Sequence, residues 1–261
     1  MIDPTLELLA LLALVAFVAG FIDSIAGGGG LITVPALLLA GFSPVETLGT
    51  NKLQGLFGVG SATIAYASKG HVDVKSQLLP AALAAVAAAV GALVATIMPG
   101  DALRVLMPIL LIAIALYFAL KPNMDDVDRA QRMRPALFAA TVVPMIGFYD
   151  GVFGPGTGSF FMLAFVALGG YGVLKATAHT KLLNFATNIG GFVAFAFVGA
   201  VVWKAGLVMG AAQFAGARLG AHLAMKKGAR LIKPLLIVTC IALAIRLLAD
   251  PQNPIRVWLA G

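Results

Sequence analysis

The chain has 261 residues, of which 61% are hydrophobic and only 11% are charged, and its net charge is +7. Soluble domains carry about 25% charged residues, so this composition excludes a soluble globular domain and predicts an integral membrane protein. Four of the 18 basic residues lie in 121–134 and another four in 226–233. Such clusters are typical of cytoplasmic loops beside membrane spans. We therefore expect the lipid bilayer, and no nucleic acid, as a partner.

The first half of the chain is predicted to contain five apolar helical segments, the first two separated by a run of glycines. They cover 5–22, 31–40, 51–66, 76–98 and 103–120. The Ser-Pro pair within 41–46 predicts a loop. No basic segment precedes the first apolar run, so we expect the first helix to remain in the protein and not to be cleaved as a signal peptide.

A charged linker over 121–134 divides the chain, and the second half repeats the order of the first. Its apolar segments cover 135–153, 159–168, 181–202, 205–225 and 234–249, with a basic loop at 226–233 before the last. The least charged stretches are 8–22, 78–98, 103–120 and 181–202. Each approaches the ~20 residues that cross a hydrocarbon core of about 30 Å. The predicted division is a first transmembrane repeat over 1–120, the linker, and a second repeat over 135–261.

The two halves share a motif in which Gly-Phe-x-Asp precedes a run of small residues. It reads Gly20-Phe-Ile-Asp-Ser-Ile-Ala-Gly-Gly-Gly-Gly30 in the first half and Gly147-Phe-Tyr-Asp-Gly-Val-Phe-Gly-Pro-Gly-Thr157 in the second. At offsets of 127 to 129 residues the similarity continues, and Lys52 aligns with Lys181. Broken helices at matching places in two halves indicate a transporter's binding site.

If each glycine-centred pair of segments enters the membrane and returns to the same side, each half contains one re-entrant hairpin and three full crossings. The chain is then an all-α polytopic membrane protein with about eight transmembrane segments, and its halves are inverted repeats. The loops 67–75, 121–134 and 226–233 would all be cytoplasmic. Hairpins that cross fully would also leave 121–134 and 226–233 on one side, so charge does not decide between the two topologies.

Non-helical backbone inside a bilayer requires protein or water around it, and the start of a short helix after a glycine run carries partial positive charge that attracts anions. Two such ends facing each other would form one anion pocket. The alternative is that the glycines only allow close helix packing, which we prefer for the pair at 216 and 220. The candidate substrate-binding residues are Gly28, Gly29, Gly30, Thr33, Asn51, Lys52, Gly156, Thr157, Gly158, Ser159, Thr180, Lys181 and Asn184.

Lys52 and Lys181 are each predicted to begin a helix, where a lysine either contacts substrate or extends to the membrane interface. Lys181, Asn184 and Asn188 fall on one helical face and predict the polar lining of a path. Arg218 and His222, one turn apart, could form a gate or likewise extend to the interface.

Asp23 and Asp150 precede the glycine runs, and an ionisable residue within a membrane is a functional candidate. A carboxylate repels an anionic ligand, so we expect a structural role in capping the short helix, or proton coupling, and no direct substrate contact.

The sequence shows neither a phosphate-binding loop nor the residue order of a nucleophilic triad, and its single cysteine provides no disulfide framework or metal cluster. We therefore expect no enzyme, no metal and no cofactor, and transport driven by a gradient.

The first glycine motif with its following Leu-Ile-Thr-Val-Pro35, then Thr-Asn-Lys-Leu53, the second glycine motif and His-Thr-Lys-Leu182 resemble the TauE/SafE sulfite exporter family. This is also called the 4-toluene sulfonate uptake permease family, and the resemblance covers 5–250. It implies a multi-pass permease of the bacterial inner membrane for sulfite or organosulfonates, acting in export or uptake. The second motif reads Gly-Pro-Gly-Thr-Gly158 where the family more often has three glycines.

Two alternatives remain at this point. The substrate could be another small anion such as a carboxylate, or the chain could be a non-transporting membrane accessory protein. A helix face with small residues four apart would also allow a homodimer.

Overall fold

The computed structural model describes residues 4–97, 112–113, 116–117, 119–120 and 125–249. Within these residues the chain is helical and contains no strand. Most of the segment expected over 103–120 lies outside them. The first half contains α1 (Leu6–Ala26), α2 (Gly29–Leu39), α3 (Pro44–Ala67) and α4 (Val74–Ala95). The second contains α6 (Pro135–Leu137), the π-helix Phe138–Val142, α7 (Val143–Val152), α8 (Thr157–Ala167), α9 (Val173–Phe197), α10 (Trp203–Lys227) and α11 (Ala229–Ala249).

Among the helices that begin earlier than the sequence predicted, α3 and α9 differ most. α3 begins at Pro44 because Ser43 and Glu46 form a reciprocal capping box with a proline at the first helical position, so the loop predicted over 41–46 is wrong in its second half. α9 begins at Val173 instead of 181. The basic loop predicted over 226–233 is also wrong: it is helical except at Gly228, where φ is +53°. Lysine and arginine are good helix formers, so a charged segment need not be a loop.

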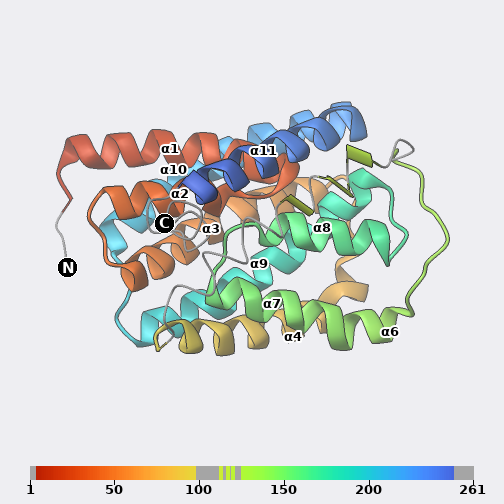
Figure 1. The fold of residues 1–261 in the computed structure, drawn as a ribbon, viewed down its shortest axis with the longest axis horizontal. Coiled ribbons are helices and arrows are strands. Elements are labelled where there is room, and N and C mark those ends of the chain that lie inside the picture. The colour runs from red at the N-terminus through yellow and green to blue at the C-terminus, as the bar shows by residue number, and fades with distance from the viewer. Residues whose placement is uncertain (1–3, 98–111, 114–115, 118, 121–124, 250–261) are drawn as a thin grey trace, which may run out of the picture.

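The two glycine runs form hairpins whose tips meet. α1 ends at Ala26, and Gly27 (φ +82°) and Gly28 (φ +93°) turn the chain into α2. A Cβ on Gly27 would lie only 2.8 Å from the backbone nitrogen of Ser159, at the start of α8. In Figure 1 the α1–α2 hairpin opens toward the left end of the molecule and α7–α8 toward the right end. The hairpins therefore approach the middle from opposite ends.

Each hairpin packs against a helix of the other half. Gly91 of α4 touches α7, where a Cβ would lie 2.2 Å from the carbonyl oxygen of Phe148. Gly220 of α10 touches α1, where a Cβ would lie 2.3 Å from the carbonyl oxygen of Phe21. The two contacts are related by the sequence repeat, because Gly91 aligns with Gly220 and Phe21 with Phe148. Gly216 also packs on α1, so this small-residue face is covered within the chain and gives no argument for a homodimer.

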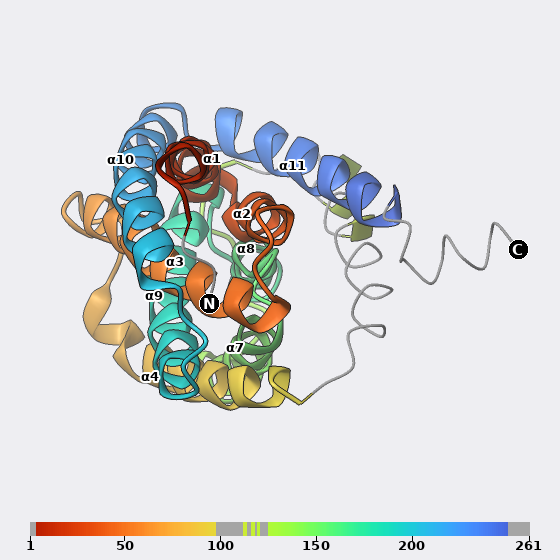
Figure 2. The same cartoon turned by 90° about the vertical axis from the view of Figure 1, so that its left-hand side faces the viewer.

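The outer surface is apolar and the interior is partly polar. Seen end-on in Figure 2, the helices form a bundle with α3 near its centre, and α11 lies along the outside. Among the described residues three helical segments are long and apolar enough to cross a membrane, namely Leu6–Ala26, Val74–Ala95 and Pro135–Val152. α2 and α8 are apolar but shorter. Leucines such as Leu14, Leu78 and Leu79 are exposed outward, as lipid contact requires.

The linker residues 125–134 anchor the starts of two helices through aspartates. Asp126 accepts hydrogen bonds from the N–H groups of Leu174 in α9 and Ala229 in α11. Asp128 accepts from the Gly172 N–H and pairs with Lys175. Burial raises the pKa of the Asp128 carboxyl, but these two contacts outweigh it and hold the pKa below its usual value.

We expect Gly91→Val and Gly220→Val to destabilise the protein by similar amounts, because each new side chain would force apart a helix pair that joins the two halves. Overpacking of this kind costs about 1–3 kcal/mol. The measurement is thermal unfolding in detergent, with Ala82→Val, on the exposed face of α4, as the control. Wild-type melting of both glycine variants would contradict the packing described.

Candidate anion site

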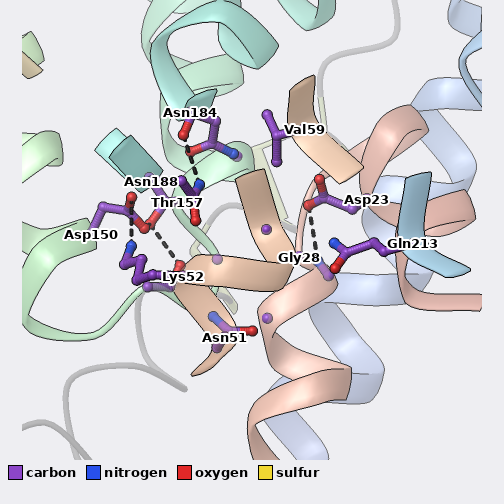
Figure 3. A pocket seen from close by; sticks show the side chains of 16 residues that line it. Asp23, Gly28, Asn51, Lys52, Val59, Asp150, Thr157, Asn184, Asn188 and Gln213 are labelled. Carbon is purple, nitrogen blue, oxygen red and sulfur yellow. Dashed lines mark hydrogen bonds and ion pairs between the residues drawn. The ribbon is translucent and has the colours of Figure 1, made fainter. Parts of the chain in front are cut away.

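A small polar cavity lies where the two hairpin tips meet. Its volume is about 30 Å³, and one water needs roughly 10–15 Å³ on this measure, so the cavity has room for about two waters. In Figure 3 Asp150 and Lys52 lie on one side, and Asp23 and Gln213 lie on the other. The lining residues are Asp23, Gly28, Gly29, Gly30, Asn51, Lys52, Gly55, Val59, Asp150, Gly154, Gly156, Thr157, Gly158, Asn184, Asn188 and Gln213.

Most residues that the sequence nominated line this cavity, and four lie beside it. Thr33 donates to the side-chain oxygen of Asn51, and Ser159 donates to the carbonyl of Ala26. Thr180 and Lys181 are fully buried behind the lining. The candidates predicted from the sequence did not include Gln213, Val59 or Gly55. The repeat could not reveal Gln213, because the residue that aligns with it is Ala84.

Lys52 forms an ion pair with Asp150 across the two halves. Its Nζ lies 2.8 Å from Oδ2 of Asp150, and the two side chains are only 2% and 3% exposed. The other carboxylate oxygen, Oδ1, accepts a hydrogen bond of 2.7 Å from the hydroxyl of Thr157 at the start of α8. Asp150 thus connects α7, α8 and α3.

Lys181 forms the matching pair with Asp23, and here the lysine comes from the second half and the aspartate from the first. Its Nζ lies 3.3 Å from Oδ2 of Asp23 and also donates to the Asp23 backbone carbonyl. Oδ1 of Asp23 accepts a hydrogen bond of 2.9 Å from the N–H of Gly29, the first residue of α2. Each half therefore supplies the lysine for the other half's aspartate, and each aspartate also holds the start of its own short helix.

The starts of α2 and α8 both face the cavity. Each follows a glycine in the left-handed conformation, Gly28 (φ +93°) and Gly156 (φ +87°). The first N–H groups of an α-helix have no intrahelical acceptor, and Gly30 and Gly158 occupy such positions in the lining. These backbone donors and the two helix dipoles favour negative charge in the cavity.

Amide side chains complete the lining. The Asn51 oxygen accepts from both Thr33 and Gln54, which leaves its NH₂ group as the donor near Gly30 and Gly154. Asn188 donates to the Asn184 backbone carbonyl. Together with Gln213 these groups add neutral polar atoms to the lining.

The chain matches the family model described as sulfite exporter TauE/SafE over residues 12–247. It is 65% identical over 257 residues to the probable membrane transporter protein ORF9 of Sinorhizobium sp, covering 98% of each chain. It is 47% identical to the probable membrane transporter protein YfcA of Escherichia coli K12, covering 99% of this chain and 96% of that protein. A probable membrane transporter protein of Haemophilus influenzae is 42% identical over 248 residues, covering 95% and 97%. No solved structure matches the chain.

The chain belongs to the TauE/SafE family.

Family membership and the apolar helices make this protein a multi-pass membrane transporter. The prediction that Lys52 and Lys181 each begin a helix is wrong. Each is the ninth residue of its helix, in α3 and α9, and is buried, so neither anchors the chain at the membrane interface. Arg218 and His222 are exposed on α10 and do not line the cavity.

Removing one member of a buried pair leaves an uncompensated charge, which costs about 3–5 kcal/mol. We therefore expect Lys181→Met to lower the free energy of unfolding by that amount. The double variant Lys181→Met with Asp23→Asn should recover at least half of the loss, because no orphan charge remains and the amide oxygen can still cap α2. The measurement is unfolding in detergent by heat or denaturant.

Lys175→Met, at the exposed pair with Asp128, is the matched control, and it should cost at most about 1 kcal/mol. If the losses in free energy of unfolding from Lys181→Met and Asp23→Asn add in the double variant, the two side chains do not stabilise each other.

Proposed function

We propose that this TauE/SafE-family transporter is a secondary permease of small sulfur-containing oxyanions, sulfite or organosulfonates. The anion would lie near the membrane midplane, between the start of α2, the start of α8 and Lys52. The observation that carries this proposal is the meeting of two helix starts and a buried lysine in one cavity. Backbone N–H groups, hydroxyls and an ammonium suit the oxygens of such ions.

We further propose that residues 1–120 and 135–261 are inverted repeats, with 121–134 as a cytoplasmic linker, in a bacterial inner membrane. Support comes from the opposite openings of the two hairpins in Figure 1 and from the repeat-related contacts of Gly91 and Gly220. Each hairpin would be re-entrant, because α2 and α8 have 11 residues each, about 16 Å at 1.5 Å per residue. That length does not cross a core of about 30 Å.

The cavity volume favours a compact anion. Space for about two waters suits sulfite or the sulfonate head group. A longer organic chain would require the hairpin tips to separate. A small carboxylate is the second candidate, since the same donors would bind it.

A non-transporting accessory protein is the less favoured class. Buried amides around a polar cavity are expensive within a membrane, and a scaffold needs no such cavity. The relatives carry transporter names as well.

The test is uptake of isotope-labelled sulfite into proteoliposomes. Asn188→Asp keeps the side-chain shape but adds a negative charge to the lining, and two unit charges 4 Å apart repel by about 4 kcal/mol at an effective dielectric constant of 20. We expect uptake to fall at least tenfold. Gln131→Glu, which adds the same charge on the exposed linker, should leave uptake unchanged.

Equal uptake by the Asn188→Asp and Gln131→Glu variants would place the anion path elsewhere. Uptake of acetate but not of sulfite by the wild-type protein would favour a small carboxylate as the substrate.

A further inference from the structure

The two buried ion pairs are not equivalent. Lys181 has two oxygen partners on Asp23 and does not line the cavity. Lys52 and Asp150 both line it. The contact between Lys52 Nζ and Asp150 Oδ2 is close, at 2.8 Å, but Oδ2 accepts no hydrogen bond of good geometry, although it is buried. Among the described residues, Lys52 is thus the partner that holds this carboxylate oxygen at the cavity.

The four buried charges sum to zero before any substrate enters. An anion that joins them adds an uncompensated negative charge in a medium that screens poorly. If Lys52 leaves Asp150 to pair with the anion, Asp150 becomes a buried carboxylate without a cation. A proton on Asp150 removes that charge.

We propose that Asp150 is a proton-binding site and that each anion enters the cavity together with one proton. The inference rests on the proposed anion transport. The proton forms an O–H bond with Oδ2 of Asp150, and Lys52 keeps its three protons while its ammonium moves from Asp150 to the anion. The proton leaves hydronium, whose O–H bond is the covalent bond that breaks, and a water molecule remains. The hydrogen bond from Thr157 to Oδ1 can persist in both states.

The groups around the two aspartates provide no competing proton acceptor among the described residues. Asp150 faces Lys52 of α3, Thr157 of α8 and the amides of α9, and the neighbouring Tyr149 hydroxyl donates to the carbonyl of Pro155. Asp23 faces Lys181, and the Tyr66 hydroxyl from α3 donates to the Ser24 carbonyl.

The buried His179 lies elsewhere, packed against Phe165 and Tyr171 with a hydrogen-bond contact to the Lys175 carbonyl. It therefore does not supply the proton acceptor of the cavity.

Two consequences follow for transport. The empty site and the site loaded with a monoanion and a proton carry the same net charge, so uptake of a monoanion is electroneutral. An inward proton gradient then drives uptake and not export.

The experiment uses the full-length wild-type protein in proteoliposomes with methanesulfonate, a strong-acid anion that carries no proton of its own near neutral pH. A pH-sensitive dye inside the vesicles counts the protons that enter with labelled methanesulfonate. We expect one proton for each anion, and no change in uptake when a potassium diffusion potential is imposed. If methanesulfonate enters without protons and its uptake changes with the imposed membrane potential, the proposed proton coupling is wrong. The proposed sulfonate transport would still stand.

Asp150→Asn supplies a neutral carboxamide in place of the protonated carboxyl. We expect this variant to exchange labelled for unlabelled methanesulfonate, to move no protons, and to lose accumulation driven by a pH gradient. Glu7→Gln, an exposed carboxylate at the start of α1, should behave as wild type. We expect the Asp23→Asn variant to take up less methanesulfonate, but still one proton with each anion that enters.

Proton entry with the anion in the Asp150→Asn variant would overturn the assignment of the site. If wild type takes up neither methanesulfonate nor sulfite, the proposed function fails, and the coupling proposal fails with it.

Discussion

The architecture depends on two buried ion pairs, each of which joins one half of the chain to the other. Lys52 reaches Asp150 and Lys181 reaches Asp23, and an ammonium or carboxylate left alone in this interior would be strongly unfavourable. Neither half can therefore satisfy its own charges. The same aspartates hold the starts of α2 and α8, so charge pairing also fixes the two hairpin tips and the cavity between them.

Close helix packing supports this arrangement. Lipid tails are as apolar as leucine, so helices in a membrane associate through small residues and van der Waals contact more than through hydrophobic burial. Gly91 and Gly220 let α4 and α10 approach the opposite half's hairpin. Gly27 and Gly158 do the same at the tips, where a Cβ on Gly158 would lie 2.9 Å from the Cα of Gly27. Glycine serves both as the helix breaker and as the contact surface.

The sequence predicted the helical class, the broken helices and most of the cavity lining, because the repeat marked Asp23, Asp150 and the two lysines as special. It did not predict which aspartate each lysine would meet, because pairing between halves depends on three-dimensional packing that no local pattern encodes. It placed Lys52 and Lys181 at helix starts because the polar residues that precede each lysine indicate a loop. Gln213 was missed because a glutamine within an alanine- and glycine-rich helix gives no local signal, and the repeat offers only Ala84 opposite it.

We propose a small sulfur oxyanion in the cavity between the two hairpin tips. The most direct measurement is a cryo-electron microscopy structure of the full-length protein with methanesulfonate bound. The account predicts density for the anion among Gly30, Gly158 and Lys52, with the Lys181–Asp23 pair unbroken. Density confined to another surface, with the Lys52–Asp150 pair still closed and the cavity holding only water, would contradict it.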